Sequence, residues 1–321
     1  MTRVLVTGAT GFVGRALCPV LAEAGFQVTA AVRDSAAKVP SADRIAVVPD
    51  IGPDADWTEA LQDADAVVHL AARVHRMGEG KNEALAENRR VNADGTRRLA
   101  EQASRIGPKR FVFLSSVKVN GETTDGRPPF SETDAPDPRD AYAISKWEAE
   151  RALAEIGDLE PVILRPPLVY GPGVRANFLA LLKICRAAPP LPLGSVDNRR
   201  SLLFVGNLAD AIRCCLVRPE AAGKTYMISD GEDVSTPDLI RRLARAMGRP
   251  ARLVPFPPGL LRFLGGLAGK GETVARLLDT LAVDSRKIRQ DLGWSPPSAL
   301  GEGLARTAAW FAAEGDAQTK G

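Results

Sequence analysis

A tyrosine and a lysine four residues apart carry the strongest chemical signal in this sequence. They are Tyr142 and Lys146, within the polar segment 140–146. Residues four apart lie on one face of a helix. A phenol has an ordinary pKa of ~10, and a neighbouring ammonium group favours the phenolate and lowers that pKa. The pair is predicted to exchange a proton with a carbonyl or alcohol in redox chemistry. The same spacing also occurs in surface pairs, so its meaning depends on the rest of the chain.

A glycine-rich turn near the N-terminus predicts a dinucleotide site. The apolar run Arg3–Thr7 leads into Gly8, Gly11 and Gly14, and a helical pattern follows. The spacing is Gly-x-x-Gly-x-x-Gly rather than Gly-x-Gly-x-x-Gly, but the physical requirement is the same. Glycines permit a tight turn and let a pyrophosphate approach the N–H groups of the first helix. Pro19 lies inside this helix and is predicted to distort it.

The composition indicates a globular cytoplasmic enzyme with no metal site. The chain has 321 residues and a formal net charge of +3, without a basic tract that would indicate nucleic acid. It lacks an apolar run of ~18 residues, so no membrane partner is expected, and it enters a core strand too early for a signal peptide. Two histidines are too few for a zinc site. The cysteines are predicted to be buried thiols: Cys18, Cys185, Cys214 and Cys215.

Alternating strand and helix patterns predict the fold. Helical patterns include Thr58–Leu61 and Val91–Arg105. Short buried strands between helices indicate an α/β, Rossmann-type, doubly wound parallel sheet. Ligands bind beyond the carboxyl ends of such strands, where the polar motifs of this chain lie. The strand-like runs are Val4–Thr7, Gln27–Val32, Ile45–Val48, Ala66–Leu70, Phe111–Ser115 and Val162–Arg165.

The regular pattern breaks down at about Pro166, which predicts a second, interleaved domain. Prolines and glycines crowd the segments that follow, and Pro255–Gly271 is predicted to be rich in loops. We expect a dinucleotide-binding domain at 1–166, with a further piece at about 203–229. A smaller C-terminal substrate domain is expected at about 167–202 and 230–321.

Together the motifs resemble the extended short-chain dehydrogenase/reductase (NAD-dependent epimerase/dehydratase) family over nearly the whole chain. Three longer blocks, at 115–122, 197–201 and 229–233, resemble bacterial nucleotide-sugar enzymes of surface polysaccharide synthesis. Among these, the chain is most similar to reductases that convert UDP-4-keto-6-deoxy-N-acetylglucosamine to UDP-N-acetylquinovosamine, and to proteins labelled UDP-glucose 4-epimerase. The resemblance rests on Thr7–Gly14, Asp50-Ile51, His69–Ala72, Val91-Asn92, Ser115-Ser116, Tyr142-x-x-x-Lys146 and Arg165–Gly173.

The resemblance implies catalytic roles. Tyr142 would be the acid/base that exchanges a proton with the sugar O4, and Lys146 would lower its pKa and hold the nicotinamide ribose. Ser116 would hydrogen-bond the same oxygen, whereas Ser115 would be structural, since strand alternation turns it away. Asn92 would support the active-site helix and strand; a helix-start cap is the other interpretation.

The same resemblance implies a set of cofactor contacts. Asp50 and Ile51 match the family's adenine contacts, although Asp50 is also typical of a solvated turn. The full set expected to bind the cofactor is Gly8, Thr10, Gly11, Phe12, Val13, Gly14, Arg33, Asp50, Ile51, Leu70, Ala71, Ala72, Asn92, Tyr142, Lys146 and Pro166.

The end of the second strand departs from the family pattern. NAD-selective members keep an acidic residue there to bond the adenosine ribose. This chain has Val32 at that position, followed by Arg33 and Asp34. Without a carboxylate there is no repulsion of a 2′-phosphate, and a guanidinium can pair with it. NADP(H) is therefore favoured and NAD(H) remains possible, because Arg33 can be an ordinary surface arginine and Asp34 can take the ribose.

The resemblance also implies contacts to a UDP-sugar. Asn177 would contact the diphosphate, and Arg200 would bind a phosphate of the UDP, with Arg199 as the alternative. Arg73, His75 and Arg76 follow the fourth strand and face the same mouth, either as ligand contacts or as a solvated loop. A homodimer is expected by analogy with the family.

Three functions remain open at this point. The first is a C4 ketoreductase that uses NADPH as a released co-substrate. The second is a 4-epimerase that retains its NAD and returns the hydride to the other face of the sugar. Both would use Ser116, Tyr142 and Lys146, and only the chemistry of the second strand separates them, in favour of the reductase. The third, a dinucleotide sensor without activity, would be expected to lose the tyrosine–lysine pair.

Overall fold

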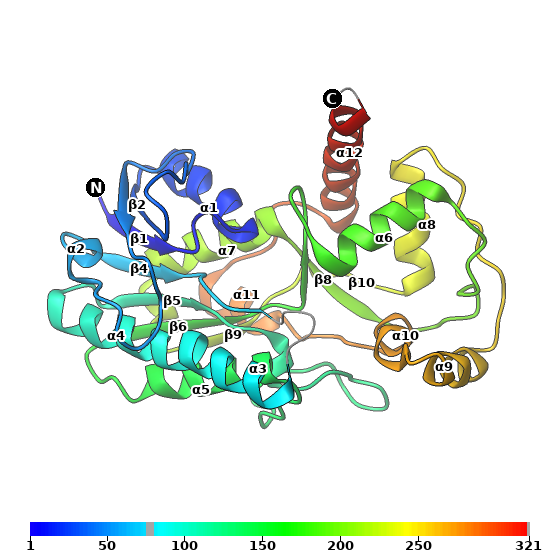
Figure 1. Cartoon of the computed structure of the whole chain (residues 1–321), viewed down its shortest axis with the longest axis horizontal. Coiled ribbons are helices and arrows are strands. Elements are labelled where there is room, and N and C mark those ends of the chain that lie inside the picture. Colours follow the sequence, from blue (N-terminus) through cyan, green and yellow to red (C-terminus); the bar gives the residue numbers. More distant parts are fainter. Residues whose placement is uncertain (75–79, 320–321) are drawn as a thin grey trace.

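The computed structural model, which describes residues 1–74 and 80–319, is built on a seven-stranded sheet (Figure 1). Every pairing in this sheet is parallel, which confirms the predicted doubly wound architecture. The strand order reverses between β1 and β4, where a doubly wound fold binds its ligand. In spatial order the strands are β3 (Arg44–Val47), β2 (Gln27–Val32), β1 (Arg3–Thr7), β4 (Ala66–His69), β5 (Arg110–Leu114), β6 (Glu160–Arg165) and β9 (Thr225–Met227).

Helices bury both faces of this sheet, which explains why its strands read as continuous apolar runs. Alternate residues of one strand point to opposite faces. Val4 and Val6 of β1 pack with α1 (Phe12–Glu23), α7 (Val205–Val217) and α11 (Arg286–Leu292). Leu5 packs toward α2 (Thr58–Leu61), α4 (Gly95–Ile106) and α5 (Ala141–Ala154). The four cysteines are buried thiols, as predicted.

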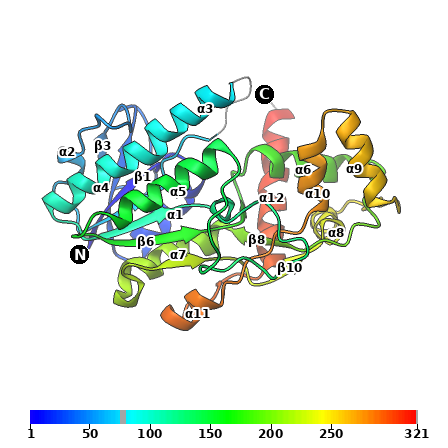
Figure 2. The same cartoon turned by 90° about the horizontal axis from the view of Figure 1, so that it is seen from below.

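The fourth strand is followed by a helical run longer than predicted. The sequence indicated a helix from Val91, whereas the run begins at Lys81 as α3 (Lys81–Asn88) and continues through a π-helical turn, η1 (Arg89–Asp94), into α4. Figure 2 shows this run lying beside α5. The extra residue of a π-turn is common at functional sites. Here the turn contains Asn92, which is therefore not a helix-start cap.

Two predictions rest on the positions of prolines, one for Pro19 and one for the segment Pro255–Gly271. Helix α1 continues through Pro19 from Phe12 to Glu23. The segment Pro255–Gly271, expected to be loop-rich, contains the helix α9 (Pro258–Leu267), which leads into α10 (Gly271–Leu278). The prolines fall at the start of α9, where a missing N–H costs no hydrogen bond.

A smaller three-stranded sheet organises the second part of the chain. Its order is β10 (Asp233–Val234), β8 (Arg200–Phe204) and β7 (Leu168–Tyr170). The helices α6 (Ala176–Ala187), α8 (Thr236–Ala246) and α12 (Leu300–Thr319) enclose its core. The expected boundaries put all of 230–321 in this domain, whereas α11 returns to the large sheet, where Ile288 and Leu292 are buried. None of the helices described is long and apolar enough to cross a membrane.

Two 3₁₀ turns complete the described elements. They are η2 (Val117–Val119), directly after β5, and η3 (Pro219–Ala221), between α7 and β9. The first of them continues the segment that carries Ser116, so its packing against α5 bears on the site.

Candidate active site

The carboxyl ends of the central strands bring the predicted motifs to one edge of the sheet. Thr7 at the end of β1 pairs in register with His69 of β4, and His69 pairs with Phe113 of β5. Leu114 pairs in turn with Leu164 of β6. The segments that follow these strands, which carry most of the predicted site residues, therefore start side by side.

Two glycines make the first turn possible. Gly8 has a φ of +67°, and a Cβ at this position would lie 2.7 Å from the Ala71 nitrogen. A Cβ at Gly14 would lie 2.4 Å from the Gly8 oxygen. The Gly11 N–H donates to the Gly8 carbonyl at 2.9 Å and closes the turn. A side chain at Gly8 or Gly14 would separate β1, α1 and the segment after β4, so the turn requires glycine.

The N-terminus of α1 is an uncapped positive end. Its first N–H groups lack an intrahelical acceptor, as in any helix. No described side chain caps them at Gly11, and the first turn, which includes Phe12 and Val13, contains no acidic residue. Thr10 is exposed beside it, and its carbonyl accepts from Arg15 Nε at 2.9 Å. Such an end holds an anionic group such as a pyrophosphate.

Tyr142 and Lys146 lie on α5, as predicted. Asp140 caps this helix, since its Oδ1 accepts from the Ala143 N–H at 2.7 Å. The Lys146 ammonium is buried and donates to the Leu114 carbonyl at 2.8 Å. It also lies 5.9 Å from the centre of the Tyr142 ring. The end of β5 thus fixes the lysine, and the lysine is close enough to act on the tyrosine.

The pKa values differ from the expectation for this pair. Burial raises the pKa of Tyr142 to about 12, and the Asp140 carboxylate adds to the rise. Burial also lowers the pKa of Lys146 to about 7, against the attraction of Glu150. The sequence predicted a lowered phenol pKa because it shows the ammonium but not the loss of solvent. Tyr142 consequently holds its proton at neutral pH.

Ser116 and Ser115 follow β5 and have different surroundings. Ser116 precedes η2, and its Oγ accepts from the Lys118 N–H at 3.2 Å. The Lys118 ammonium pairs with Asp140 at 2.5 Å, which ties the Ser116 segment to the start of α5 two residues before Tyr142. Ser115, expected to be structural, is buried and donates its hydroxyl to Glu150.

Asn92 joins two parts of the site, and its side-chain amide hydrogen-bonds to other residues of the protein. Its Oδ1 accepts from the Arg73 N–H at 2.7 Å, and its Nδ2 donates to the Arg73 carbonyl at 2.9 Å. Nδ2 also donates to Ser145 Oγ at 3.0 Å, and Ser145 donates to the Tyr142 carbonyl at 2.8 Å. The buried amide therefore positions the loop after β4 and the active-site helix, as the resemblance implied, and its direct contact to the cofactor stays a prediction.

A buried histidine, which the sequence analysis excluded as a zinc ligand and assigned no other role, links the same elements. The Thr96 hydroxyl donates to the Asn92 carbonyl at 2.6 Å, so its oxygen accepts from His69 Nε2 at 3.0 Å. His69 Nδ1 then accepts from the Thr7 hydroxyl at 2.7 Å, and Thr7 accepts from the Ala71 N–H at 3.2 Å. Burial lowers the pKa of His69 to about 3, so the ring is neutral. The signal for this residue was its place in the His69–Ala72 motif.

Asp50 and Arg33, both predicted to bind the cofactor, differ in their contacts, because Asp50 is held by other described residues and Arg33 is not. Asp50 Oδ2 accepts from Arg90 Nη1 at 2.8 Å, and its Oδ1 accepts from the Ile51 N–H at 2.9 Å. The Arg90 hydrogen bond lowers the Asp50 pKa. Arg33, directly after β2, is exposed and makes no ion pair or hydrogen bond with any residue the structure describes. The neighbouring Asp34 carboxylate accepts from the Ala36 N–H at 2.9 Å.

The remaining predicted cofactor positions lie at the ends of β4 and β6. Leu70, Ala71 and Ala72 are partly exposed after β4. Pro166 follows β6, and its carbonyl accepts from the Val117 N–H at 2.9 Å, which places it beside the Ser116 segment. His75 and Arg76 lie outside the described residues.

The substrate-side residues come from the smaller domain. Asn177 is exposed in the first turn of α6. Gly173, with a φ of +86°, lies close to Phe12, since a Cβ there would be 3.6 Å from its ring. This contact places the segment before α6 next to the start of α1. Asn177 is thus carried by the second domain to the region of the dinucleotide turn.

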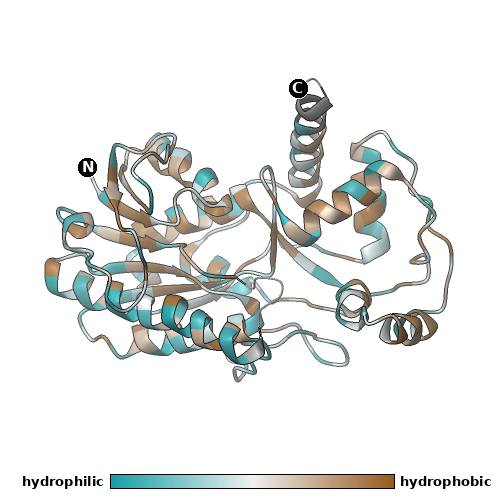
Figure 3. Cartoon of the chain, in the orientation of Figure 1, coloured by the Kyte–Doolittle hydropathy of each residue, from teal (hydrophilic) through white to brown (hydrophobic). Residues whose placement is uncertain are grey.

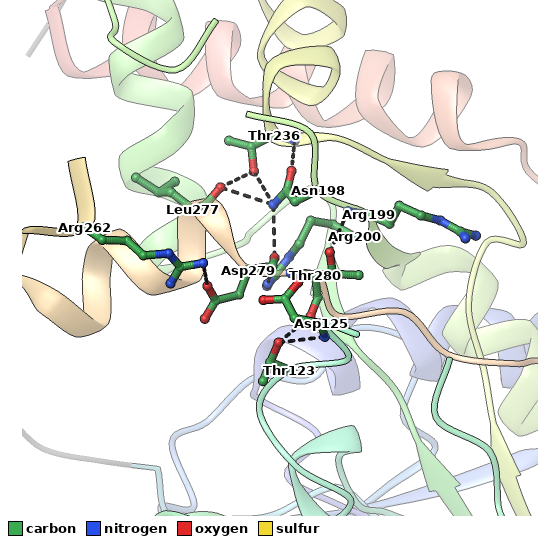
Figure 4. A network of polar contacts seen from close by, with 10 residues as sticks. All are labelled: Thr123, Asp125, Asn198, Arg199, Arg200, Thr236, Arg262, Leu277, Asp279 and Thr280. Carbon is green, nitrogen blue, oxygen red and sulfur yellow. Dashed lines mark hydrogen bonds and ion pairs between the residues drawn. The ribbon is translucent and has the colours of Figure 1, made fainter. Parts of the chain in front are cut away.

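Arg200 and Arg199 differ in their surroundings (Figure 4). Arg200 is largely buried, which lowers its pKa, and its Nη1 donates to the Asp279 carbonyl at 3.2 Å. Arg199 is exposed and pairs with Asp233 at 2.8 Å. Only Arg200 is directed toward Asp125 and Asp279, so it is the member of the pair that faces the junction of the two domains.

A network of polar contacts that the sequence analysis does not predict holds this junction. Buried Asn198 donates to the carbonyls of Leu277 and Asp279, and it accepts from the Thr236 N–H at 2.8 Å. Asp125, which follows the Ser116 segment, accepts from the Thr280 N–H at 3.0 Å. The network connects the loop after β5 to the smaller domain.

The sequence analysis also does not predict a buried ion pair. Arg165 at the end of β6 pairs with Glu150 of α5, and Arg165 Nε donates to Glu150 Oε1 at 3.0 Å. Arg165 Nη1 donates to Asn120 Oδ1 at 2.9 Å. Glu150 is one helical turn beyond Lys146 and also accepts from Ser115. The pair therefore fixes α5 against the ends of β5 and β6.

Comparison with known proteins identifies similar chains. Residues 4–229 match the profile of the NAD dependent epimerase/dehydratase family. The chain is 43% identical over 313 residues to a UDP-glucose 4-epimerase of Vibrio cholerae, covering 96% of this chain and 95% of that protein. It is 31% identical over 309 residues to a 3-diazoavenalumate denitrifying reductase of a Streptomyces species, covering 92% and 96%. The solved structure of MoeE5 with UDP-glucuronic acid and NAD superposes with a TM-score of 0.76 at 27% identity, covering 97% and 99%.

Proposed function

The chain belongs to the NAD-dependent epimerase/dehydratase family of enzymes, and on this basis we propose that it is an oxidoreductase acting at C4 of a UDP-sugar. The observation that carries the proposal is the partly buried Tyr142, which holds its proton beside Lys146 at the edge where the dinucleotide turn lies. UDP-sugars are named for relatives of this chain, including the MoeE5 complex.

The first turn fits a dinucleotide. Side chains at Gly8 and Gly14 would collide with backbone atoms. With glycine at both positions, the turn packs closely against the uncapped N-terminal end of α1. The pyrophosphate would lie against the N–H groups of Phe12 and Val13, since the Gly11 N–H already donates to the Gly8 carbonyl. Thr10, Leu70, Ala71, Ala72 and Pro166 would line the remainder of this site. When bound, the nicotinamide supplies or accepts the hydride.

Side chains of the protein would transfer the proton and hydrogen-bond to the sugar oxygen. Tyr142 would donate its proton to O4 as a ketone becomes an alcohol, and it would take the proton back in the reverse direction. Ser116 would donate a hydrogen bond to the same oxygen. Lys146, anchored by the Leu114 carbonyl, would hold the nicotinamide ribose and supply positive charge beside the phenol.

The substrate diphosphate would bind at the junction of the two domains. Arg200 has one guanidinium contact to the Asp279 carbonyl and lies close to two carboxylates, so its charge is retained but only partly neutralised. Asn177 would donate to the diphosphate from the first turn of α6. The large sheet would thus hold the dinucleotide and the smaller domain the UDP-sugar.

We propose net reduction of a UDP-4-keto-6-deoxy-N-acetylhexosamine as the reaction. One observation supports this direction. Val32 stands where NAD-selective proteins carry a ribose-binding acid, and the next residue, Arg33, forms no ion pair within the described chain, which favours NADP(H), a cofactor suited to release in each cycle. Asp50 would keep its place near the adenine through Arg90 and Ile51.

A second candidate function is 4-epimerisation of UDP-glucose or UDP-N-acetylglucosamine. The relative of Vibrio cholerae, at 43% identity, favours it. The same three catalytic residues would serve, with Tyr142 first removing and later returning the proton.

Net cofactor consumption separates the two candidates. A reductase should consume NADPH in proportion to a supplied UDP-4-keto sugar. An epimerase should interconvert UDP-glucose and its 4-epimer without net change in the reduced nicotinamide. The measurement is nicotinamide absorbance together with chromatography of the sugar nucleotides. Formation of the 4-epimer, with no reaction on the keto sugar, would establish the epimerase and exclude the reductase.

The cofactor preference is tested at Arg33. We expect NADPH to bind more tightly than NADH, and Arg33→Ala to remove the difference. A charge-assisted contact of ~1.5–3 kcal/mol corresponds to roughly 10–150-fold in affinity. Binding is measured by fluorescence titration of each reduced cofactor. Lys38→Ala, which removes another exposed cation of the same loop, should leave the ratio unchanged. Equal affinities in the parent protein would contradict the assignment.

A further inference from the structure

Helix α9 exposes an apolar face that no described residue covers. Leu260, Phe263, Leu264 and Leu267 are all exposed, with Phe263 at 62% and Leu267 at 73%. Their spacing places them on one side of the helix. Figure 3 shows α9 as a predominantly hydrophobic helix at the end of the molecule opposite the N-terminus. An apolar patch of this kind marks an interaction site on a folded protein.

The opposite side of α9 is anchored, so the apolar face has a fixed direction. A Cβ at buried Gly265 would lie 2.5 Å from the Val274 side chain, which shows how closely α9 packs on α10. Arg262 pairs with Asp279 at 2.5 Å, as Figure 4 shows. The same Asp279 contacts Arg200 through its carbonyl. The apolar face therefore belongs to a rigid part of the smaller domain and points away from it.

The surrounding sequence is strongly basic. Residues 239–271 contain seven arginines and lysines and no aspartate or glutamate. Arg242 and Arg262 are paired with acids, whereas five others are exposed and form no ion pair within the described chain. The nearest acids are neutralised, because Glu272 pairs with Arg276 and Asp279 with Arg262. The five free cations are Arg241, Arg245, Arg249, Arg252 and Lys270.

We propose that α9 is an interfacial anchor that binds the surface of an anionic lipid bilayer. Leu260, Phe263, Leu264 and Leu267 would enter the boundary between headgroups and acyl chains. Arg249 and Arg252, which precede α9 in the sequence, and Lys270, which follows it, would contact the phosphates. The segment that contains α9 fits lipid because it is both apolar and cationic. The sequence analysis expected no membrane partner from the absence of a spanning segment, but an interfacial helix does not span.

A second copy of the chain fits this surface less well. In a two-fold dimer the same patch would meet itself, since such an interface is isologous. The cations on both sides of α9 in the sequence exceed the nearby acids Glu272 and Asp279, so two such segments brought together would repel each other. An anionic bilayer carries negative charge, which would attract these cations.

Vesicle sedimentation of the full chain tests the proposal. The protein should pellet with vesicles of phosphatidylglycerol and phosphatidylcholine, less with phosphatidylcholine alone, and less as salt is added. Phe263→Glu/Leu267→Glu should weaken binding roughly 100-fold, at about tenfold for each apolar side chain kept out of the lipid. Val217→Glu is the matched control, because Val217 is 52% exposed at the end of α7, outside the patch. This control should bind as the parent does.

Each alternative outcome is decisive. The proposal is overturned if the parent protein stays in the supernatant with phosphatidylglycerol vesicles, or if Val217→Glu reduces binding as much as the double variant. It is also overturned if light scattering shows a dimer that the double variant dissociates and no vesicle binding occurs. Circular dichroism checks that the double variant folds. If it does not, Arg249→Ala/Arg252→Ala/Lys270→Ala replaces it and should lose the preference for anionic vesicles.

Discussion

Replacing Tyr142 by phenylalanine is expected to abolish most of the turnover while the protein folds and binds its cofactor normally. The variant keeps the partly buried ring beside Lys146 and loses only the hydroxyl group, and with it the proton that desolvation holds on the phenol. Proton transfer by a positioned group contributes ~10²–10⁴-fold, so kcat should fall by that factor. Ser116→Ala should slow the reaction less, because it removes one hydrogen bond to the sugar oxygen. Steady-state kinetics with the accepted UDP-sugar and a cofactor titration measure both effects.

Tyr226→Phe is the control for this experiment. Tyr226 lies on β9, and its hydroxyl contacts Asp291 rather than any group of the candidate site. Its loss should leave kcat unchanged. Turnover by Tyr142→Phe within a few-fold of the parent would show that another group supplies the proton.

Replacing Glu150 by alanine is expected to destabilise the protein severely. The Glu150–Arg165 pair is buried on both sides, at 2% and 5% side-chain exposure. Removing one partner leaves the Arg165 charge without compensation, a change that costs ~3–5 kcal/mol. The Ser115 hydroxyl also loses its acceptor. Urea unfolding followed by circular dichroism should show this loss as a lower free energy of unfolding.

Two further variants separate the buried charge from other effects. Glu155→Ala breaks the exposed pair with Arg97 and should leave the free energy of unfolding close to that of the parent, because solvent screens an exposed pair. Glu150→Leu/Arg165→Met removes both charges and should recover much of the lost stability. A Glu150→Ala protein as stable as Glu155→Ala would mean that the ion pair does not fix α5 against the strands.

Several of the candidate contacts follow directly from local sequence. The glycine turn, the strand ends and the tyrosine–lysine spacing each depend on residues that are close in the chain. Gly8 and Gly14 are required by a turn only a few residues long, and strands covered on both faces must be apolar throughout. The parallel order then brings their carboxyl ends together, because every crossover returns the chain to the same edge.

Other properties depended on partners distant in sequence. Asp50 is paired with Arg90, and Asn92 with Arg73 and Ser145, contacts that no local pattern indicates. The helix at Pro258–Leu267 lies in the segment Pro255–Gly271, whose many prolines and glycines predict loops, yet α9 forms there and packs closely on α10 where Gly265 meets Val274.

The sequence by itself determined the fold class, the dinucleotide turn and the identity of the candidate acid/base, because these rest on backbone requirements and on short, fixed spacings. Only the tertiary structure decided the direction of the Tyr142 pKa, the selection of Arg200 over Arg199 and the exposure of α9. The physical reason is that a pKa and an exposed face are set by desolvation and by neighbours from other elements. The residue types show which ionisable groups the chain carries, whereas the folded structure determines which of these groups are desolvated and which stay solvated.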